Sequence, residues 1–289
     1  MRSAIVSFND KKKKLLGYRA FLKLKKAYQL LRMRPDQKKM VLVLGCQRSG
    51  TTLMARIFNR DFRSNVYTAF SPLSSKDPHG LRLNPLDEVE RQLKEDTGSL
   101  VVLKPIVESQ NAGTLLDFFN NSKAIWMFRN CRDVVASNIR RFGDRNGIDD
   151  LRPIVQDRRD DWRADKVSKY TREIIADFFS EEMDIYDAAA LFWFSRNRLF
   201  FELDLDKHPG VMTCHYDDLV TCPDTVMRGL YHFIDHRYPG NRIVREVKPT
   251  SIGKGTSIGL SHEVEMLCLD LYARLREVHK SKLDKTLLV

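Results

Sequence analysis

The stretch VLVLGCQRSGTT, from Val41 to Thr52, has the residue types of a loop that binds an anionic group. An apolar run leads into Gly45, four residues separate it from Gly50, and hydroxyl residues follow, which predicts a strand, a loop and a helix start. Backbone N–H groups in such a loop point at an anion, and the dipole of the following helix adds to them. A nucleotide-hydrolysing loop has lysine where this chain has Thr51. An ordinary tight turn is the alternative interpretation.

Side chains in and after this loop can replace the missing lysine as donors. Arg48 offers a planar fork that takes two anionic oxygens, and Thr51 and Thr52 add hydroxyl groups. A second pair stands in WMFRNCRDVVAS, where Arg129 ends an apolar run and Ser137 lies eight residues later on a helical pattern. Ligands of open α/β sheets bind at the carboxyl ends of strands, so this pair indicates a second phosphate site. A surface arginine and a neutral helix serine are the alternative.

The elements that must position these residues alternate between strand and helix. The predicted strands are MVLVLG, SLVVLKP, KAIWMFRN and GVMTCHY, and helical stretches such as TTLMARIFNR and RDVVASNIRRFG follow them. This alternation predicts an α/β fold with a parallel sheet and helices on both faces. Residues 149–206 are charged and helical, which predicts an insertion over the sheet. The predicted domain spans residues 37–289 and follows a basic helix within residues 1–36.

The composition indicates which kinds of binding partner and which cellular compartment to expect. The 289 residues carry a formal net charge of +11, which favours anionic partners. Five scattered cysteines without a C-x-x-C pair favour a reducing compartment, and the sequence shows neither a secretory signal nor an apolar run near the ~20 residues that span a bilayer. We therefore expect a cytoplasmic location. No nucleic-acid motif occurs, so we expect no nucleic-acid partner.

Residues 10–34, DKKKKLLGYRAFLKLKKAYQLLRMR, predict the basic helix. Its apolar residues can share one broad face; they are Leu15, Tyr18, Leu22, Leu24, Tyr28 and Leu31. Such a helix can lie on an anionic membrane, which would make the protein membrane-peripheral. The alternative is that the helix packs on the domain with its lysines in water.

Together the motifs resemble the sulfotransferases that use 3′-phosphoadenylyl sulfate, PAPS. The stretch RSGTT is similar to the loop with which that family holds the 5′-phosphosulfate; it comprises Arg48, Ser49, Gly50, Thr51 and Thr52. Arg129 and Ser137 match the element that holds the 3′-phosphate. Arginine in place of lysine at Arg48 is closer to the tyrosylprotein, glycan-modifying and bacterial branches than to the cytosolic members.

Two further stretches support the resemblance, and two positions depart from it. The stretch HYDDLVTCPDTVMRGLYHFI is similar to a family strand end and helix, which places Tyr216 near the adenine. The stretch GKGTSIG resembles a loop over the 3′-phosphate, and Lys254 and Gly255 carry over. Leu53 stands where cytosolic members often have a stacking tryptophan, and Gly253 stands where the last loop usually has arginine.

The resemblance implies transfer of a sulfonate group from PAPS to a hydroxyl or amine acceptor by in-line displacement, with 3′,5′-adenosine bisphosphate, PAP, as product and no required metal. Arg48 and Lys104 would stabilise charge on the leaving phosphate. The acceptor stays open between a sugar, a lipid, a peptide and a small molecule.

The general base is the least defined part of this predicted site. Ile106 stands where cytosolic members have a histidine, two residues after Lys104. Glu108 is the first candidate for the base, and a structural acid is the alternative interpretation of it. Asp77 and His79 are the other candidates, because they are the titratable groups nearest to where other branches carry a catalytic glutamate.

Three other functions remain as alternatives to an active sulfotransferase. A P-loop kinase or NTPase would need the lysine that Thr51 replaces. An inactive relative would still bind nucleotide, and a non-enzymatic binder of membrane or nucleic acid would use the basic charge. Magnesium-dependent ATP hydrolysis would favour the first, and lipid binding that ignores PAP would favour the last.

Overall fold

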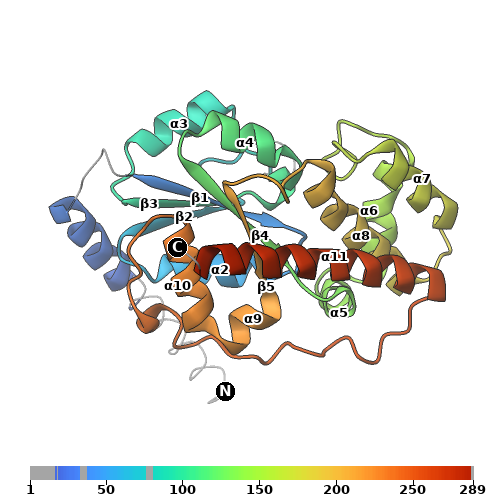
Figure 1. The fold of residues 1–289 in the computed structure, drawn as a ribbon. Helices are drawn as coiled ribbons and strands as arrows, with labels where there is room; N and C mark the ends of the chain where they lie inside the picture. Colours follow the sequence, from blue (N-terminus) through green and yellow to red (C-terminus); the bar gives the residue numbers. More distant parts are fainter. Residues whose placement is uncertain (1–16, 18, 33–37, 76–80, 288–289) are drawn as a thin grey trace, which may run out of the picture.

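A five-stranded sheet forms the centre of the protein (Figure 1), whose computed structural model describes residues 17, 19–32, 38–75 and 81–287. The strands lie in the spatial order β2 (Ser64–Thr68), β3 (Leu100–Lys104), β1 (Lys39–Gly45), β4 (Ser122–Phe128) and β5 (Val211–His215). Every neighbouring pair is parallel. The predicted α/β fold with a parallel sheet is therefore confirmed.

Helices cover both faces of the sheet (Figure 1). They are α2 (Thr51–Asn59), α3 (Leu86–Lys94), α4 (Ala112–Phe118), α5 (Cys131–Phe142), α6 (Asn146–Val155), α7 (Lys169–Phe178), α8 (Ile185–Glu202), α9 (Tyr216–Thr221), α10 (Pro223–Phe233) and α11 (His262–Leu287), with short 3₁₀ helices η2 (Ile106–Asn111) and η3 (Asn241–Ile243). None of the helices described is long and apolar enough to cross a membrane.

The central strand β1 is buried on both faces, and its side chains divide the core into two parts. Leu42 and Leu44 pack with α3, α4, α5 and α8, whereas Val41 and Val43 pack with α2 and α10. Successive side chains of a strand point to opposite faces, so an unbroken apolar run is what a strand covered on both sides requires. That apolar run is also the reason why β1 can be predicted from the sequence.

The strand β2 has no counterpart among the strands predicted from sequence. It lies at the edge of the sheet and is only partly buried, so its sequence SNVYT lacks a continuous apolar run. Polar contacts hold it instead: Asn65 Nδ2 and the Tyr67 hydroxyl donate to the Asp96 carboxylate at 2.9 and 2.6 Å. Edge strands with one neighbour carry a weaker hydrophobic pattern than central ones.

Helices α6, α7 and α8 occupy most of the stretch between α5 and β5. The aromatic run of α8 lies in the core, where Trp193 and Phe200 are fully buried and Phe200 contacts Trp126 of β4 with ring centroids 5.4 Å apart. These side chains serve packing rather than an open acceptor surface. The charged stretch around Arg158 and Arg159 is exposed and pairs with neighbouring aspartates.

The N-terminal helix, described over residues 19–32, packs on the domain through a face that differs from the predicted one. Phe21 and Tyr28 contact the Phe62 ring edge-on, at centroid distances of 5.2 and 5.8 Å. Between them Lys25 is buried, and its ammonium donates to the backbone oxygen of Asn59 at 2.9 Å.

The predicted apolar face of this helix is therefore corrected. Leu22, Leu24 and Leu31 are exposed, because hydrogen bonds from buried polar side chains hold the packed side of the helix. Tyr28, which also belongs to the predicted face, does pack on the domain through Phe62. Leu15 and Tyr18 lie outside the described residues.

Replacing Gly45 by alanine should destabilise the fold. Gly45 has a φ of 123°, and an added Cβ would lie 2.2 Å from the carbonyl oxygen of Met127 on the neighbouring strand. We expect Gly45→Ala to lower the free energy of unfolding by about 2 kcal/mol or more, measured by urea denaturation.

Gly113→Ala is the matched control, because nothing lies within 4 Å of the Cβ position at Gly113 in α4. Its free energy of unfolding should rise slightly, by less than about 1 kcal/mol. Equal effects of the two substitutions would contradict the close approach of β1 and β4.

Candidate active site

The loop between β1 and α2 lies at the carboxyl end of the central strand, as the sequence spacing predicts. Arg48 and Gly50 both have left-handed backbone, with φ of 65° and 97°. Ser109 of η2 supports the loop from behind, since its hydroxyl accepts from the Gly45 N–H at 3.1 Å. Thr51 is buried at the first turn of α2, whereas Thr52 is exposed. The loop therefore places the start of α2 at the carboxyl end of the central strand.

Arg48 joins this loop to the second predicted motif. Its Nε donates to the Ser137 hydroxyl on α5 at 3.0 Å. Ser137 is buried. Ser49, the loop residue after Arg48, is also buried, and its hydroxyl has no hydrogen-bond partner among the described residues. The structure thus brings together two motifs that lie almost ninety residues apart in the chain.

Tyr216 fills the space beside the loop. An added Cβ at Gly50 would lie 2.5 Å from Cδ2 of the Tyr216 ring, so a glycine is required for the ring to reach the loop backbone. The guanidinium of Arg129 stacks on the same ring, with its central carbon 4.2 Å from the centroid. Loop, strand end and tyrosine therefore form one site.

Asp133 organises the remaining predicted contact. It pairs with Arg129 at 3.1 Å and accepts the backbone N–H groups of Gly253 and Gly255 at 3.0 and 2.8 Å. Arg129 also donates to the backbone oxygen of Ser251. The loop that carries exposed Lys254 is therefore fixed over the start of α5, where Gly255 leaves no room for a Cβ against the Arg132 backbone.

The site has an excess of positive charge. Burial lowers the pKa of Arg48, and the neighbouring charges of Arg141, Arg140 and Arg129 lower it further. Burial likewise lowers the pKa of Lys104 at the end of β3, and Arg48 adds to this. Cations that depress one another in this way are stabilised by an anion between them.

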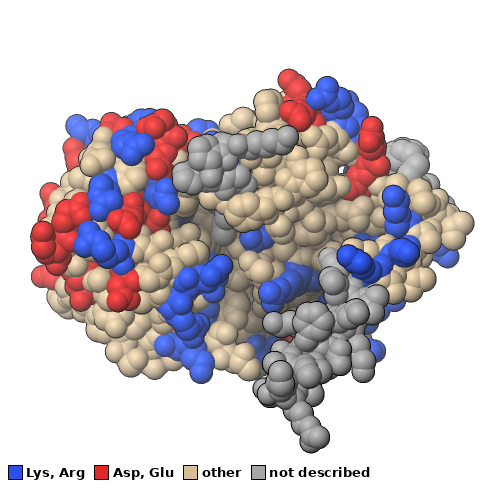
Figure 2. All heavy atoms as spheres, turned by 180° about the vertical axis from the view of Figure 1, so that it is seen from behind, with Lys and Arg blue, Asp and Glu red and all other residues tan. Residues whose placement is uncertain are grey.

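Figure 2 shows how charged side chains are distributed over one face of the molecule. Lys and Arg side chains flank a central hollow on the face shown, where Asp and Glu are sparse. Over α6 and α7, in contrast, both signs of charge are mixed. The two surfaces differ as a ligand-binding face and a solvated helical face would.

Glu108, the predicted general base, lies in η2 with its carboxylate already engaged. Arg82 Nε and the Leu83 N–H donate to Oε1 at 2.7 and 3.1 Å, and Asn111 Nδ2 donates to Oε2 at 2.7 Å. The side chain is buried and lines a cavity of about 450 Å³. Both carboxylate oxygens are thus engaged by donors, and the role of Glu108 as base stays a prediction. Asp77 and His79 lie outside the described residues.

Sequence reasoning missed two carboxylates that shape the site. Asp133 lies four residues after Arg129, so helical spacing was a signal for that pair. Asp150 on α6 gave no such signal. It accepts from Gln47 of the loop at 3.2 Å and from Arg163 at 2.5 Å, and burial raises its pKa although Arg163 opposes the shift.

Comparisons with known proteins identify the family and the fold. A family model of the sulfotransferase domain matches residues 38–257, and the chain therefore belongs to the sulfotransferase family. The sulfotransferase domain of the Synechococcus PCC 7002 olefin synthase is 15% identical, with a TM-score of 0.50 over 83% of this chain and 94% of that one. The sulfotransferase domain of the curacin biosynthetic pathway is 16% identical, with a TM-score of 0.52 over 83% and 98%. A search of curated proteins gives no match.

Replacing Asp133 should release the loop around Gly253 and Gly255. Asp133→Ala removes the buried partner of Arg129 together with two backbone acceptor contacts. We expect a loss of about 3 kcal/mol in the free energy of unfolding by urea denaturation, since an unpaired buried charge remains.

The exposed pair of Asp224 and Arg228, at the same i,i+4 spacing, provides the control. Asp224→Ala should change stability by less than about 1 kcal/mol. A loss for Asp133→Ala no larger than for this control would show that Asp133 does not anchor the loop.

Proposed function

We propose that this sulfotransferase takes its sulfonate group from PAPS, transfers it to a hydroxyl or amine acceptor and releases PAP. The observation that carries the proposal is the cluster of buried Arg129 with the partly buried Arg48 and Lys104, at the carboxyl ends of β4, β1 and β3. Family membership supports sulfonate transfer itself. The donor is inferred from how the cluster and its neighbours fit a nucleotide that carries two phosphates.

The residues present fit such a nucleotide. The Nε of Arg129 is buried without a hydrogen-bond partner among the described residues, and it lies beside the Tyr216 ring, as a contact for a phosphate near an adenine requires. Ser137, which contacts Arg48, and the loop of Lys254, which is bound to Asp133, would complete the contacts to the 3′-phosphate. The β1–α2 loop would hold the 5′-phosphosulfate at a helix N-terminus.

The chain's own contribution to the reaction is electrostatic and positional. PAPS, when bound, supplies the sulfonate, whose bond to the leaving phosphate oxygen breaks as the bond to the acceptor forms. Arg48 and Lys104 would offset the negative charge that develops on that oxygen, from positions fixed before the reaction begins. Because both cations are already partly desolvated, their effect on this charge is stronger than in water.

The acceptor has to lose a proton in the same reaction. Glu108 remains our first candidate for that role, through the cavity that it lines with Arg82 and Asn111. Its hydrogen bonds would have to rearrange, because both carboxylate oxygens already accept from Arg82, Leu83 and Asn111. Asp77 and His79 are the alternatives. A sugar, lipid, peptide or small molecule can each carry the required hydroxyl or amine.

Calorimetric titration of PAP, without magnesium, tests the nucleotide site. Wild type should bind, and Arg129→Ala should lose about 1.5–3 kcal/mol of binding free energy, as expected for one charge-assisted contact. Arg48→Ala should also lose affinity, and it leaves the buried pair of Arg129 and Asp133 intact. Arg158→Ala, on the exposed mixed-charge surface, is the control and should bind as wild type does.

The outcomes of this titration separate the alternatives. Absence of PAP binding to the wild type would overturn the proposal, provided that a cooperative unfolding transition shows the protein to be folded. ATP binding that requires magnesium would then favour a nucleotide kinase or NTPase. PAP binding without PAP release from PAPS, across acceptors of all four classes, would indicate an inactive relative.

The affinity for PAP should also depend on Lys104 at alkaline pH. An anion binds the protonated lysine, and burial lowers the pKa of Lys104 below its ordinary value of 10.5. Affinity should therefore fall as the pH rises from neutrality toward 10.5, by up to about 1.5 kcal/mol in binding free energy.

Lys104→Arg is the matched variant, because arginine keeps its charge over this range. Its PAP affinity should stay level where that of wild type falls. The same decline in both proteins would show that another group causes the pH dependence.

A further inference from the structure

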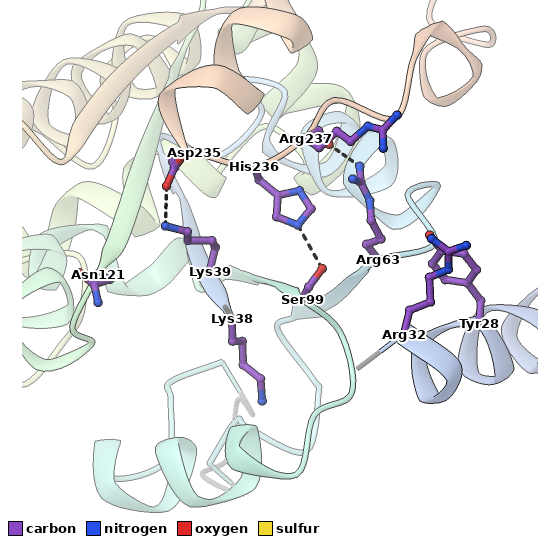
Figure 3. Close-up of a pocket in the computed structure, with 10 residues that line it drawn as sticks. All are labelled: Tyr28, Arg32, Lys38, Lys39, Arg63, Ser99, Asn121, Asp235, His236 and Arg237. Atoms are coloured by element: carbon purple, nitrogen blue, oxygen red, sulfur yellow. Dashed lines mark hydrogen bonds and ion pairs between the residues drawn. The ribbon is translucent and has the colours of Figure 1, made fainter. Parts of the chain in front are cut away.

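A basic cavity of about 640 Å³ lies at the end of the sheet opposite the candidate active site (Figure 3). Its lining comes from the points where strands begin: Lys39 opens β1, Ser99 precedes β3 and Asn121 precedes β4. Arg32 and Tyr28 reach it from the N-terminal helix. The active-site loop follows the other end of β1, so the sheet separates the two sites.

The cavity holds more positive than negative charge. Among its cations Lys39 pairs with Asp235 at 2.7 Å, and Arg63 pairs with buried Asp61. For Arg32, Lys38 and Arg237, the described part of the chain provides no carboxylate within ion-pair distance. Lys38 donates instead to a backbone oxygen, that of Leu93, at 2.9 Å.

Neutral donors accompany these cations. His236 contacts the Ser99 hydroxyl through Nε2 at 3.1 Å, as Figure 3 shows. Burial lowers the pKa of His236, and the charge of Arg63 lowers it further, which favours the neutral ring. The Arg63 guanidinium is held in place by the backbone oxygen of Arg237. Fixed cations with neutral donors between them suit the oxygens of a phosphate group.

An apolar stripe runs along the exposed side of the N-terminal helix, next to this cavity. Ala20, Leu24, Ala27 and Leu31 recur at helical spacing, and all four are exposed. The exposed fractions of Leu24 and Leu31 reach 63% and 85%. Tyr28, which lines the cavity, stands four residues after Leu24 and three before Leu31, so the stripe and the cavity are neighbours on the helix surface.

We propose that this end of the protein docks on an anionic phospholipid bilayer, with a lipid phosphate headgroup in the basic cavity and Leu24 and Leu31 in the acyl boundary. Charge complementarity favours a phosphate-bearing partner, and the leucines beside the cavity favour one that has an apolar layer below its charges. A soluble phosphate compound would use the cations and leave the leucines in water. Docking of this kind leaves the opposite end of the sheet, and the candidate active site, open to solvent.

Vesicle flotation with the full chain tests this docking. The protein should bind vesicles of phosphatidylcholine mixed with phosphatidylserine and should not bind vesicles of phosphatidylcholine alone. The double variant Arg32→Glu with Arg237→Glu should lose at least about tenfold in partitioning, since each basic residue near such a surface contributes about fivefold. Both side chains are exposed, so the fold should tolerate the change.

A second double variant, Leu24→Ala with Leu31→Ala, separates docking from simple charge attraction. It keeps every cation and should still lose about tenfold or more, because the buried apolar groups are lost. The matched control is Arg158→Glu with Arg159→Glu, which reverses two exposed charges over α6 and α7 and should partition as wild type does.

Three results would overturn the proposal. The first is failure to bind the anionic vesicles. The second is an equal loss in the control variant, which would mean attraction to the net charge alone. The third is unaltered partitioning of the leucine variant together with calorimetric binding of soluble glycerophosphoserine, which would mark the cavity as a site for a free phosphate compound.

Discussion

The buried ion pair between Arg129 and Asp133 holds the candidate site together. A guanidinium at the end of β4 would be costly to bury alone, and Asp133 compensates its charge from the next helical turn. The same carboxylate accepts the N–H groups of Gly253 and Gly255 and so brings a loop more than a hundred residues away onto the site. Arg129 stacks on the Tyr216 ring, and its Nε has no hydrogen-bond partner among the residues that the structure describes.

The parallel sheet explains why these contacts gather at the carboxyl ends of its strands. The order β2-β3-β1-β4-β5 places β1 in the middle, with β3 and β4 beside it. Residues that follow these three strands therefore become neighbours, although they are spread along the chain: Arg48 after β1, Lys104 at the end of β3 and Arg129 after β4. Burial lowers the pKa of Arg48 and of Lys104, and the cations that this convergence brings close lower both further.

The two ends of the sheet thus have different chemistry. At the carboxyl end, backbone N–H groups, a helix start and partly buried cations form the candidate active site, for which we propose a nucleotide ligand. At the amino end, exposed cations of the N-terminal helix and the strand starts adjoin a row of exposed alkyl groups. A protein docked through the second end would present the first to an acceptor in solution or at the bilayer edge.

The sequence by itself determined the parallel α/β fold and the two anion motifs. Unbroken apolar runs such as MVLVLG identify doubly covered strands, and glycine and arginine spacing marks the loop that follows. Only the tertiary structure revealed the edge strand β2, the hydrogen bonds around Asp150 and those that engage the Glu108 carboxylate. Each of these depends on partners distant in the chain. It also decided which side of the N-terminal helix is buried. The hydrophobic pattern favoured the leucines, but polar contacts such as that of Lys25 with Asn59 outweigh it. A hydrogen bond to a protein partner offsets the free-energy cost of removing a polar group from water.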